Sequence, residues 1–536
     1  MKLGLIPILL GLTATPTGAG VKDQNSSSAS ASQITIRTLD ANRIQMWVND
    51  RGYLWQFSQG GASWPDTGLY GYENVVVYDH GPWIIGKVNG VPSAAMTLWE
   101  SSFAPGPIID GQPALWVHPE DSFRYHPYKI SYDSPPDDSD LVNWPKDLGA
   151  PSDPQGEALL LGDQLVWSVY NGADTTAFPV FYRAYNTQFP RITVEIHQSF
   201  YEQKAVRVND TSLLANTAFL EWTFINKGNA PVESCYVGFW SDIDFYDADQ
   251  NVPGVDTSVQ LGYCWLRVPG HGTEAVGYEL LFGPAIPEPG GTATFRGRKL
   301  DGYRNMSLSS FRGILNDYGH DFLAPPSNID ECWNVARGYD QAGETIIDSV
   351  SKLPTRFPYS GDPVTNTGWV YSLVYTKGSA GILMFSGPFI LAVGDTQWMM
   401  IALIPADAGD RLASIDLMRQ NARRLSALSY DQIAHPRTLG VDAIQPQAPT
   451  AFGLYQNYPN PFNPSTTIRY GLPVRLQVTL TVYNTLGQQV AALVKGEREA
   501  GYHEAQFNGS ALSSGVYFCR LQAGTFSQTR KFLLLR

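Results

Sequence analysis

The chain has 536 residues and a formal net charge of -13 at pH 7, with 43% hydrophobic and only 16% charged residues. This balance excludes an intrinsically disordered chain, and the acidic excess argues against nucleic acid as a partner. The 50 glycines, 37 prolines and 12% aromatic residues are typical of turns and strands, so the composition predicts a mainly β protein.

The first 33 residues have the features of an export signal followed by a spacer. One positive charge at Lys2 precedes an apolar stretch, residues 3–12, that is too short to span a bilayer, and small residues around Ala19 would allow cleavage there. We therefore predict a signal peptide at residues 1–19 and a flexible, serine-rich spacer at residues 20–33. A buried first strand is the alternative. No later stretch is long and apolar enough for a membrane helix, so we expect no transmembrane helix in the mature chain.

Residues 34–438 are expected to form a β-rich body, built as a β-sandwich of one domain or two subdomains. Apolar and polar side chains alternate over residues 218–226, and an apparent return strand follows over residues 232–240, which predicts a hairpin. Continuous apolar runs at residues 381–385 and 398–404 indicate strands buried on both faces.

One longer helix is predicted near residues 410–428, with Asp410 or Ser414 as the candidate cap at its start. Residues 439–451 follow without periodicity and with two prolines, as an extended linker would. The apolar side chains that share one face of the helix are Ile415, Met418, Ala422 and Leu425.

Acidic side chains crowd a short stretch between two predicted strands. Carboxylates this dense repel one another unless a cation neutralises them, and calcium does so with about six to eight oxygen ligands. The spacing is not that of an EF-hand, because the glycine and the terminal glutamate are not in place. We therefore predict a structural Ca2+ site, with a solvated acidic loop as the alternative of equal weight. The candidate metal ligands are Asp242, Asp244, Asp247, Asp249 and Asp256.

The four cysteines allow disulfides, because their number is even and the expected compartment is oxidising. Cys235 would open one strand and Cys264 would end its antiparallel partner, so these two are the disulfide candidate. A bridge there would close the acidic loop. We expect Cys519 to be a free core residue.

Catalytic signatures are weak throughout the chain. There is no His-Glu-x-x-His, Gly-x-Ser-x-Gly or phosphate loop. Paired carboxylates for glycoside hydrolysis would come from distant strands and leave no local motif, so an extracellular hydrolase of polysaccharide is the alternative function. The many tryptophans and tyrosines are predicted to be core residues rather than a sugar-stacking platform.

Residues 452–536 differ from the body in charge and composition. From residue 451 onward, eight Lys or Arg face three Glu, a net charge of +5, so the preceding residues carry -18, and all 14 tryptophans lie in that preceding part. Turns at Asn484–Gly487 and Ser513–Gly515 separate alternating runs, which predicts about seven short strands in a sandwich. The segment's motif residues are Tyr458, Pro459, Asn460, Pro461, Phe462, Asn463, Pro464, Gly487, Gly515 and Tyr517.

These motifs, in this order and spacing, resemble the type A C-terminal sorting domain of the type IX secretion system, an immunoglobulin-like sandwich related to the flagellar hook-cap domain. The resemblance implies recognition by outer-membrane secretion machinery and a secreted or cell-surface location. An accessory sandwich without an export role is the alternative. Short segments of the body, such as residues 143–151 and 161–171, resemble segments of large secreted proteins that carry the same C-terminal domain. This resemblance implies no particular activity for the body.

The sequence therefore predicts an exported cargo protein whose body is non-catalytic and binds glycans or other surface components. Exposed tryptophan on a flat face would favour such binding, whereas a cleft with two carboxylates roughly 5–10 Å apart would favour the hydrolase. No cofactor besides calcium is expected.

Overall fold

The computed structural model describes residues 34–54, 60–65, 74–98, 100–176, 189–205, 211–246, 248–270, 272–315, 325–371, 380–439, 452–455, 457, 460, 462, 464–498 and 500–534. The predicted signal peptide, the spacer and nearly all of the predicted linker lie outside these residues. The described chain is mainly β, as its composition predicts, and its strands pair antiparallel in several sheets.

The largest sheet of the body has nine strands, whose long central members are buried on both faces. Its order along the sheet is β11 (Tyr128–Ser131), β13 (Gln164–Asn171), β14 (Val194–Glu202), β15 (Ala218–Asn226), β24 (Thr396–Asp407), β19 (Glu274–Phe282), β18 (Leu261–Leu266) and β17 (Asn251–Asp256), with β8 (Ala104–Pro105) beside β13.

A six-stranded sheet forms the second layer. Its order is β22 (Ser310–Leu315), β23 (Ala380–Leu391), β16 (Val232–Ile243), β5 (Asp79–Val88), β6 (Val91–Leu98) and β7 (Glu100–Ser101). A four-stranded sheet precedes it in the chain, with β1 (Ile36–Leu39), β2 (Gln45–Asn49), β3 (Ala62–Ser63) and β4 (Val75–Val77).

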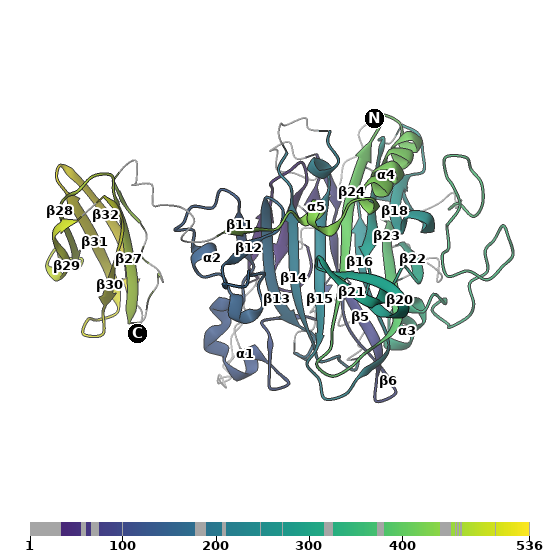
Figure 1. Ribbon diagram of the computed structural model, residues 1–536, viewed down its shortest axis with the longest axis horizontal. Coiled ribbons are helices and arrows are strands. Elements are labelled where there is room, and N and C mark those ends of the chain that lie inside the picture. Colours follow the sequence, from purple (N-terminus) through teal and green to yellow (C-terminus); the bar gives the residue numbers. More distant parts are fainter. Residues whose placement is uncertain are drawn as a thin grey trace, which may run out of the picture. The chain divides into compact units, whose positions relative to one another are not determined.

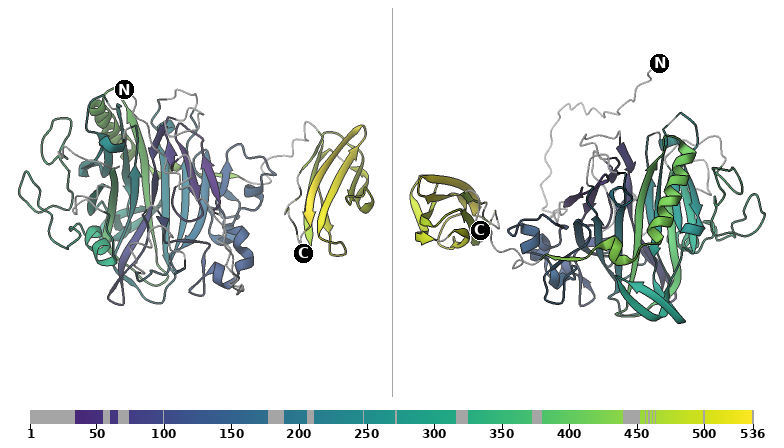
Figure 2. Two further views of the ribbon diagram at one scale, coloured as in Figure 1. Left: turned by 180° about the vertical axis from the view of Figure 1, so that it is seen from behind. Right: turned by 45° about the horizontal axis from the view of Figure 1, so that its top comes forward.

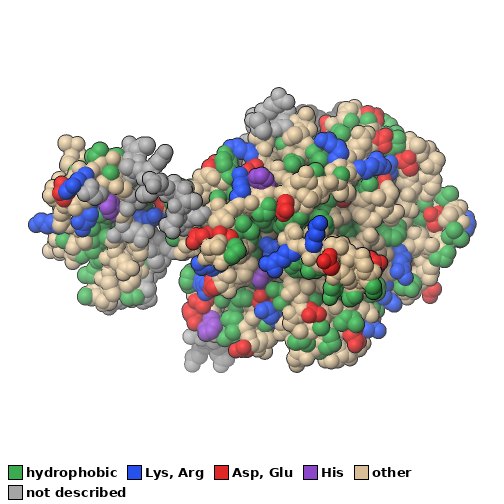
Figure 3. Space-filling model, viewed as in Figure 1, with side chains coloured by type: hydrophobic (Ala, Val, Ile, Leu, Met, Phe, Trp, Pro, Cys, Tyr) green, Lys and Arg blue, Asp and Glu red, His purple; other side chains and the backbone are tan. Residues whose placement is uncertain are grey.

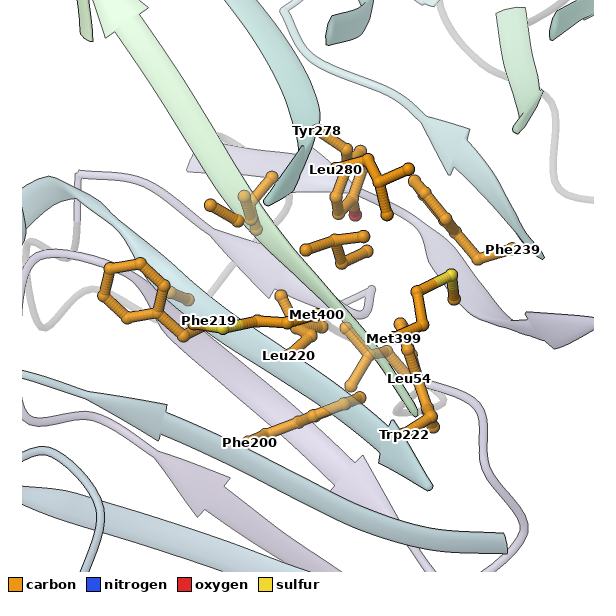
Figure 4. Close-up of a cluster of buried hydrophobic side chains, with 14 of the residues drawn as sticks. Leu54, Phe200, Phe219, Leu220, Trp222, Phe239, Tyr278, Leu280, Met399 and Met400 are labelled. Carbon is orange, nitrogen blue, oxygen red and sulfur yellow. The ribbon is translucent and has the colours of Figure 1, made fainter. Parts of the chain in front are cut away.

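The two large sheets pack face to face and enclose an aromatic core (Figure 4). Trp222 of β15 stacks on Phe239 of β16 with 6.4 Å between ring centroids, and Tyr278 of β19 meets Phe239 at 4.8 Å. Met399 of β24 is buried in the same cluster. Aromatic burial on this scale is a dominant stabilising term of a core, so the body is a β-sandwich.

The predicted hairpin between residues 218–226 and 232–240 is wrong. β15 pairs with β14 and β24, whereas β16 pairs with β5 and β23 in the opposite sheet. The chain crosses between sheets at the intervening turn, where Asn226 Nδ2 donates to Ala230 O and Leu391 O at 3.0 Å each. Both strands have two buried faces, so their alternation alone does not distinguish a hairpin from a crossing.

The other face of the nine-stranded sheet is covered by helices and a hairpin (Figures 1 and 2). The predicted helix is confirmed as α4 (Arg411–Ser426), which packs on β24 and β19. Asp410 caps it by accepting from Leu412 N and Ala413 N at 2.9 and 3.0 Å. α5 (Tyr430–Ala434) follows, and β20 (Ala285–Phe295) and β21 (Arg298–Asn305) form a two-stranded hairpin.

The remaining body elements are short. They are β9 (Ile108–Ile109), β10 (Gln112–Pro113), β12 (Ala158–Leu160), β25 (Arg437–Leu439), α1 (Ala114–Val117), α2 (Ser139–Val142) and α3 (Ile329–Ala336), with 3₁₀ turns at Pro119–Arg124, Lys146–Leu148, Leu214–Asn216, Ala248–Gln250 and Thr257–Val259. Within the described residues, no helix is long and apolar enough to cross a membrane.

The C-terminal residues form a separate two-sheet sandwich with its own core. One sheet holds β26 (Gly453–Leu454), β27 (Ser465–Leu472) and β30 (Gly501–Asn508), and the other holds β29 (Gln489–Arg498), β28 (Leu476–Tyr483), β31 (Gly515–Ala523) and β32 (Phe526–Leu534). The buried core residues of this sandwich all lie between Leu454 and Leu534. Cys519 is a free, buried member of that core, as the sequence predicts.

Candidate functional site

The motif that opens the C-terminal segment ties its first residues to the last strand of the sandwich. Asn460 Oδ1 accepts from Leu533 N at 2.9 Å, and Phe462 N donates to Leu533 O at 3.0 Å. The Phe462 ring is buried against Phe507 and Phe532. Both motif residues therefore hold the two ends of the segment together. The motif residues Tyr458, Pro459, Pro461 and Asn463 lie outside the described residues.

The two turns predicted in this segment are present. Gly487 has a φ of +76°, in the left-handed region that glycine tolerates, and the preceding Asn484 side chain accepts from two backbone N–H groups of the turn. Gly515 begins β31, where the Tyr517 hydroxyl donates to Ser513 O at 2.8 Å.

The structure describes four of the five predicted calcium ligands. Asp242 is buried at the end of β16 and Asp244 is half-buried just beyond it, whereas Asp249 is exposed and Asp247 lies outside the described residues. Asp256 lies at the far end of β17, about 16 Å along the strand from Asn251 at roughly 3.3 Å per residue. Among the described residues, no three His, Cys, Asp or Glu side chains gather as metal ligands. Calcium binding at residues 242–249 stays a prediction.

Asp256 instead belongs to a salt-bridge cluster around Arg419 of α4. Arg419 Nε lies 3.2 Å from Asp256 Oδ2, and Arg419 Nη1 donates to Asp362 Oδ1 at 2.8 Å. Burial opposes ionisation of Asp362, but hydrogen bonds from Arg419, Thr365 and a backbone N–H outweigh it and lower the pKa of Asp362 to about 2. Arg419 therefore joins the helix to two loops.

The Arg419→Gln variant should lose stability mainly above pH 4. The wild-type pKa of Asp362 is below its ordinary value of 3.8, so its stabilising contribution is present above pH 4 and disappears as the pH falls toward 2. We expect the difference in unfolding free energy between wild type and R419Q to shrink between pH 6 and pH 2.5 in urea titrations. A difference that is constant with pH would contradict this.

The predicted pairing of Cys235 with Cys264 is wrong. Cys235 lies on β16 and Cys264 on β18, which belong to different sheets, and all four cysteines are buried free thiols. Cys264 Sγ donates to Ala380 O at 3.5 Å instead. The prediction assumed that the strands of Cys235 and Cys264 pair, but β16 pairs with β5 and β23, whereas β18 pairs with β17 and β19.

Most tryptophans belong to the core, as the sequence predicts. Trp116 is the exception within the described residues, with 47% of its surface exposed, and Phe123 nearby in sequence is 64% exposed. Both come from the short segment of α1 and the 3₁₀ turn Pro119–Arg124, in which His118 pairs with Glu120. The buried tryptophans are Trp47, Trp64, Trp83, Trp144, Trp167, Trp222, Trp240, Trp265, Trp333 and Trp398.

A pocket of about 300 Å3 lies where the α4–α5 corner meets the tip of the β20–β21 hairpin. On the face shown in Figure 3, apolar side chains in this region lie between groups of both charges. The lining residues are Leu281, Phe282, Thr294, Gly297, Lys299, Leu425, Ser426, Leu428, Ser429, Tyr430, Asp431 and Ile433. The sequence did not predict this pocket, because its walls come from three separate segments.

Two buried glutamates of the nine-stranded sheet lie on the pocket side. Glu279 is completely buried and bonds through Oε1 to Ser426 Oγ, a lining atom, while its Oε2 has no hydrogen-bond partner. Burial raises the pKa of Glu279 to about 8. Glu221 accepts from Tyr201 OH at 2.7 Å and Trp398 Nε1 at 3.0 Å. Glu279 is therefore a neutral acid at neutral pH.

A second polar group lies inside the sandwich, away from solvent. His80 Nδ1 is 3.0 Å from Tyr278 OH, which also accepts from Ser241 Oγ at 3.2 Å. All three side chains are completely buried, and burial lowers the pKa of His80 to about 3. His80 is therefore a neutral core residue that is shielded from solvent.

The C-terminal segment matches a known protein family. Residues 456–535 match the family described as the secretion system C-terminal sorting domain. No curated protein matches the chain.

Similar solved structures include a polysaccharide lyase (9% identity, 63% of this chain and 34% of that chain, TM-score 0.18). Two others come from Porphyromonas gingivalis: PorZ, a surface component of the type IX secretion system (10% identity, 72% and 44%, TM-score 0.12), and dimeric latent PorU (12% identity, 72% and 33%, TM-score 0.14). The chain spans less than half the length of each. These scores are too low to carry an argument about the fold or activity of the body.

Proposed function

We propose that the body of this chain is a non-catalytic module that binds glycans. Residues 456–535 form a type IX secretion C-terminal sorting domain. The chain is therefore a cargo of the secretion machinery that reaches the outer surface or the extracellular space. The observation that carries the proposal is the exposed aromatic pair Trp116 and Phe123 on a body whose other described tryptophans are buried or half-buried.

The exposed pair suits a sugar because an aromatic face offers a flat apolar surface while its surroundings stay wet. Aromatic residues are enriched on amphipathic recognition surfaces, where one end of the side chain is apolar and the surroundings are wet. His118, Glu120 and Asp121 lie between the two rings in sequence and are polar groups suited to sugar hydroxyls. Stacking together with polar contacts is the chemistry that a glycan requires.

The carboxyl groups at the pocket favour binding over hydrolysis. A glycoside hydrolase needs an acid and a second carboxylate that both reach the scissile bond. Asp431 lines the pocket, but Glu279 is completely buried behind Ser426 and does not reach a substrate there. The two carboxyl groups thus do not make a catalytic pair.

The test is a glycan screen of the purified full chain, followed by titration of any glycan bound. Trp116→Ala combined with Phe123→Ala should weaken binding at least about tenfold, since loss of two stacking rings removes on the order of 1.4 kcal/mol or more. Tyr303→Ala, at another exposed aromatic residue on β21, is the matched control and should bind like wild type.

Two outcomes would count against this function. Unchanged affinity in the double variant would exclude the aromatic pair as the binding surface. Release of reducing sugar by the wild-type chain would show that the body is a hydrolase.

A further inference from the structure

We propose that the pocket between the α4–α5 corner and the tip of the β20–β21 hairpin is a second binding site, which takes a small zwitterion with an apolar side chain, such as a free α-amino acid. A volume of about 300 Å3 is at the lower end for ligand pockets, so the site holds one small molecule rather than a polymer. It shares no residue with the Trp116 and Phe123 pair, and it does not depend on glycan binding.

Two opposite charges line this pocket without pairing. Lys299 is exposed on β21, and Asp431 is exposed in the first turn of α5. Within the described part of the chain, no salt bridge joins Lys299 to Asp431, so the ammonium and carboxylate groups lie more than 4 Å apart. A molecule with a carboxylate and an ammonium group bridges such a gap, whereas a singly charged ligand leaves one charge unused.

The Asp431 carboxylate lies directly beside the hairpin tip. A Cβ at Gly297 would lie 3.2 Å from Asp431 Oδ1 and 3.0 Å from the Tyr430 ring. Gly297 also has a φ of +79°, which disfavours any side chain. The missing side chain leaves Asp431 open to the pocket.

Apart from the two charged side chains, much of the pocket lining is apolar. Leu281 and Phe282 come from the end of β19 and are half-buried, and Leu425, Leu428 and Ile433 come from the helix corner. Such a surface favours an aliphatic or aromatic side chain over a polyhydroxylated ring. The ligand class is therefore apolar at one end and doubly charged at the other.

Ser426 supplies a hydroxyl at the same wall. Its Oγ donates a hydrogen bond to Oε1 of the buried Glu279. The Ser426 oxygen keeps lone pairs that can accept from a donor in the pocket, such as the ligand ammonium group.

The hairpin tip that forms one wall is fixed before a ligand arrives. Arg296 Nε lies 3.7 Å from Glu221 Oε2, and Phe295 packs on Trp398 with 5.9 Å between ring centroids. Gln397 also exchanges two hydrogen bonds of 2.9 Å with the backbone of Ala285 at the base of the hairpin. A wall held at both ends reduces the ordering cost of binding.

The experiment is calorimetric titration of the full chain with L-phenylalanine, alongside three matched probes. Phenylacetate keeps only the carboxylate, phenethylamine keeps only the ammonium group, and N-acetyl-phenylalanine amide keeps neither. We expect L-phenylalanine to bind at least about tenfold more tightly than each of the three, because each lacks one or both charge-assisted contacts. Two results would overturn the proposal. One is that phenylacetate or phenethylamine binds as tightly as L-phenylalanine, and the other is that L-phenylalanine gives no heat of binding at a concentration of about 10 mM.

Two variants locate the site. Lys299→Gln and Asp431→Asn should each raise the Kd at least about tenfold, whereas Arg298→Gln, an exposed cation beside Lys299, should leave it unchanged. Melting midpoints without ligand check that all three variants fold. Full affinity in both K299Q and D431N would place the ligand elsewhere and overturn the assignment. The Trp116→Ala and Phe123→Ala double variant should bind L-phenylalanine normally, so that failure of glycan binding and failure of this site are distinguishable.

Discussion

Glu279→Gln is expected to stabilise the body by about 3 kcal/mol at pH 7.5 and to have little effect at pH 4.5. Glu279 is completely buried, and one of its carboxyl oxygens has no hydrogen-bond partner. Burial raises its pKa from 4.5 to about 8 in the folded chain. Glutamine has the same shape, stays neutral at every pH and keeps a hydrogen bond to Ser426.

The direction of this pH dependence follows from proton binding by the folded and unfolded chains. Between pH 4.5 and 8 the folded chain keeps the Glu279 proton while the unfolded chain has released it, so stability falls as the pH rises, by about 1.4 kcal/mol per pH unit. The glutamine variant lacks this slope. Urea unfolding at several pH values measures it, and tryptophan fluorescence reports on the body alone because all 14 tryptophans precede the C-terminal sandwich.

Glu233→Gln is the matched control for this prediction. Glu233 is exposed on β16, so its substitution should shift stability by less than about 0.5 kcal/mol at any of these pH values. A parallel pH dependence in wild type and E279Q would mean that Glu279 ionises normally in the folded chain.

Glu221→Ala is expected to destabilise the body by about 3–5 kcal/mol. The Glu221 carboxylate accepts from Tyr201 OH and Trp398 Nε1 and lies 3.7 Å from Arg296 Nε. Burial raises the pKa of Glu221, and Arg296 opposes that rise. Alanine leaves buried donors unsatisfied and adds a cavity between the sheet and the hairpin.

Thermal or urea unfolding of E221A measures this loss. Glu221→Gln keeps the volume and one acceptor oxygen, so it should cost less than alanine, and the exposed Glu233→Ala should cost less than about 0.5 kcal/mol. If E221A and E233A lost the same stability, the network around Glu221 would contribute nothing beyond an ordinary surface position.

The sandwich architecture was predictable wherever local pattern determines structure. Alternation marked β15, an apolar face and Asp410 marked α4, and the dense motifs of the last segment marked its fold and its family. In each case the signal lies within about twenty residues of sequence, which is the range over which side-chain period and capping act.

The pairings between distant strands were not predictable in the same way. β16 joins β5 and β23, whose partner residues lie more than 130 positions away in the chain. A strand buried on both faces has no side-chain pattern that identifies its neighbouring strands. The disulfide prediction assumed a pairing of β16 with β18 that does not form, and Asp256 was grouped with the other aspartates because they are close in sequence. Arg419, which binds Asp256, comes from a helix far along the chain.

Two glutamates in buried strands are the sequence feature that is related to the pocket. Glu221 and Glu279 stand in strands that are otherwise apolar or aromatic around them, and a charge at such a position requires a partner across the sheet. Their partners, Arg296 and Ser426, belong to the hairpin tip and the helix end that form the pocket walls. A lone glutamate in a buried strand thus indicates a covered face without identifying the cover.

The position of β32 has a consequence for quality control during export. This strand supplies Phe532 and Leu534 to the core of the C-terminal sandwich, and its Leu533 binds the opening motif through both backbone groups. A chain whose synthesis stops before Phe526 therefore cannot complete the fold that the secretion machinery recognises. Because this strand is translated after the whole body, we expect a chain truncated before β32 not to be exported, even when its body is intact.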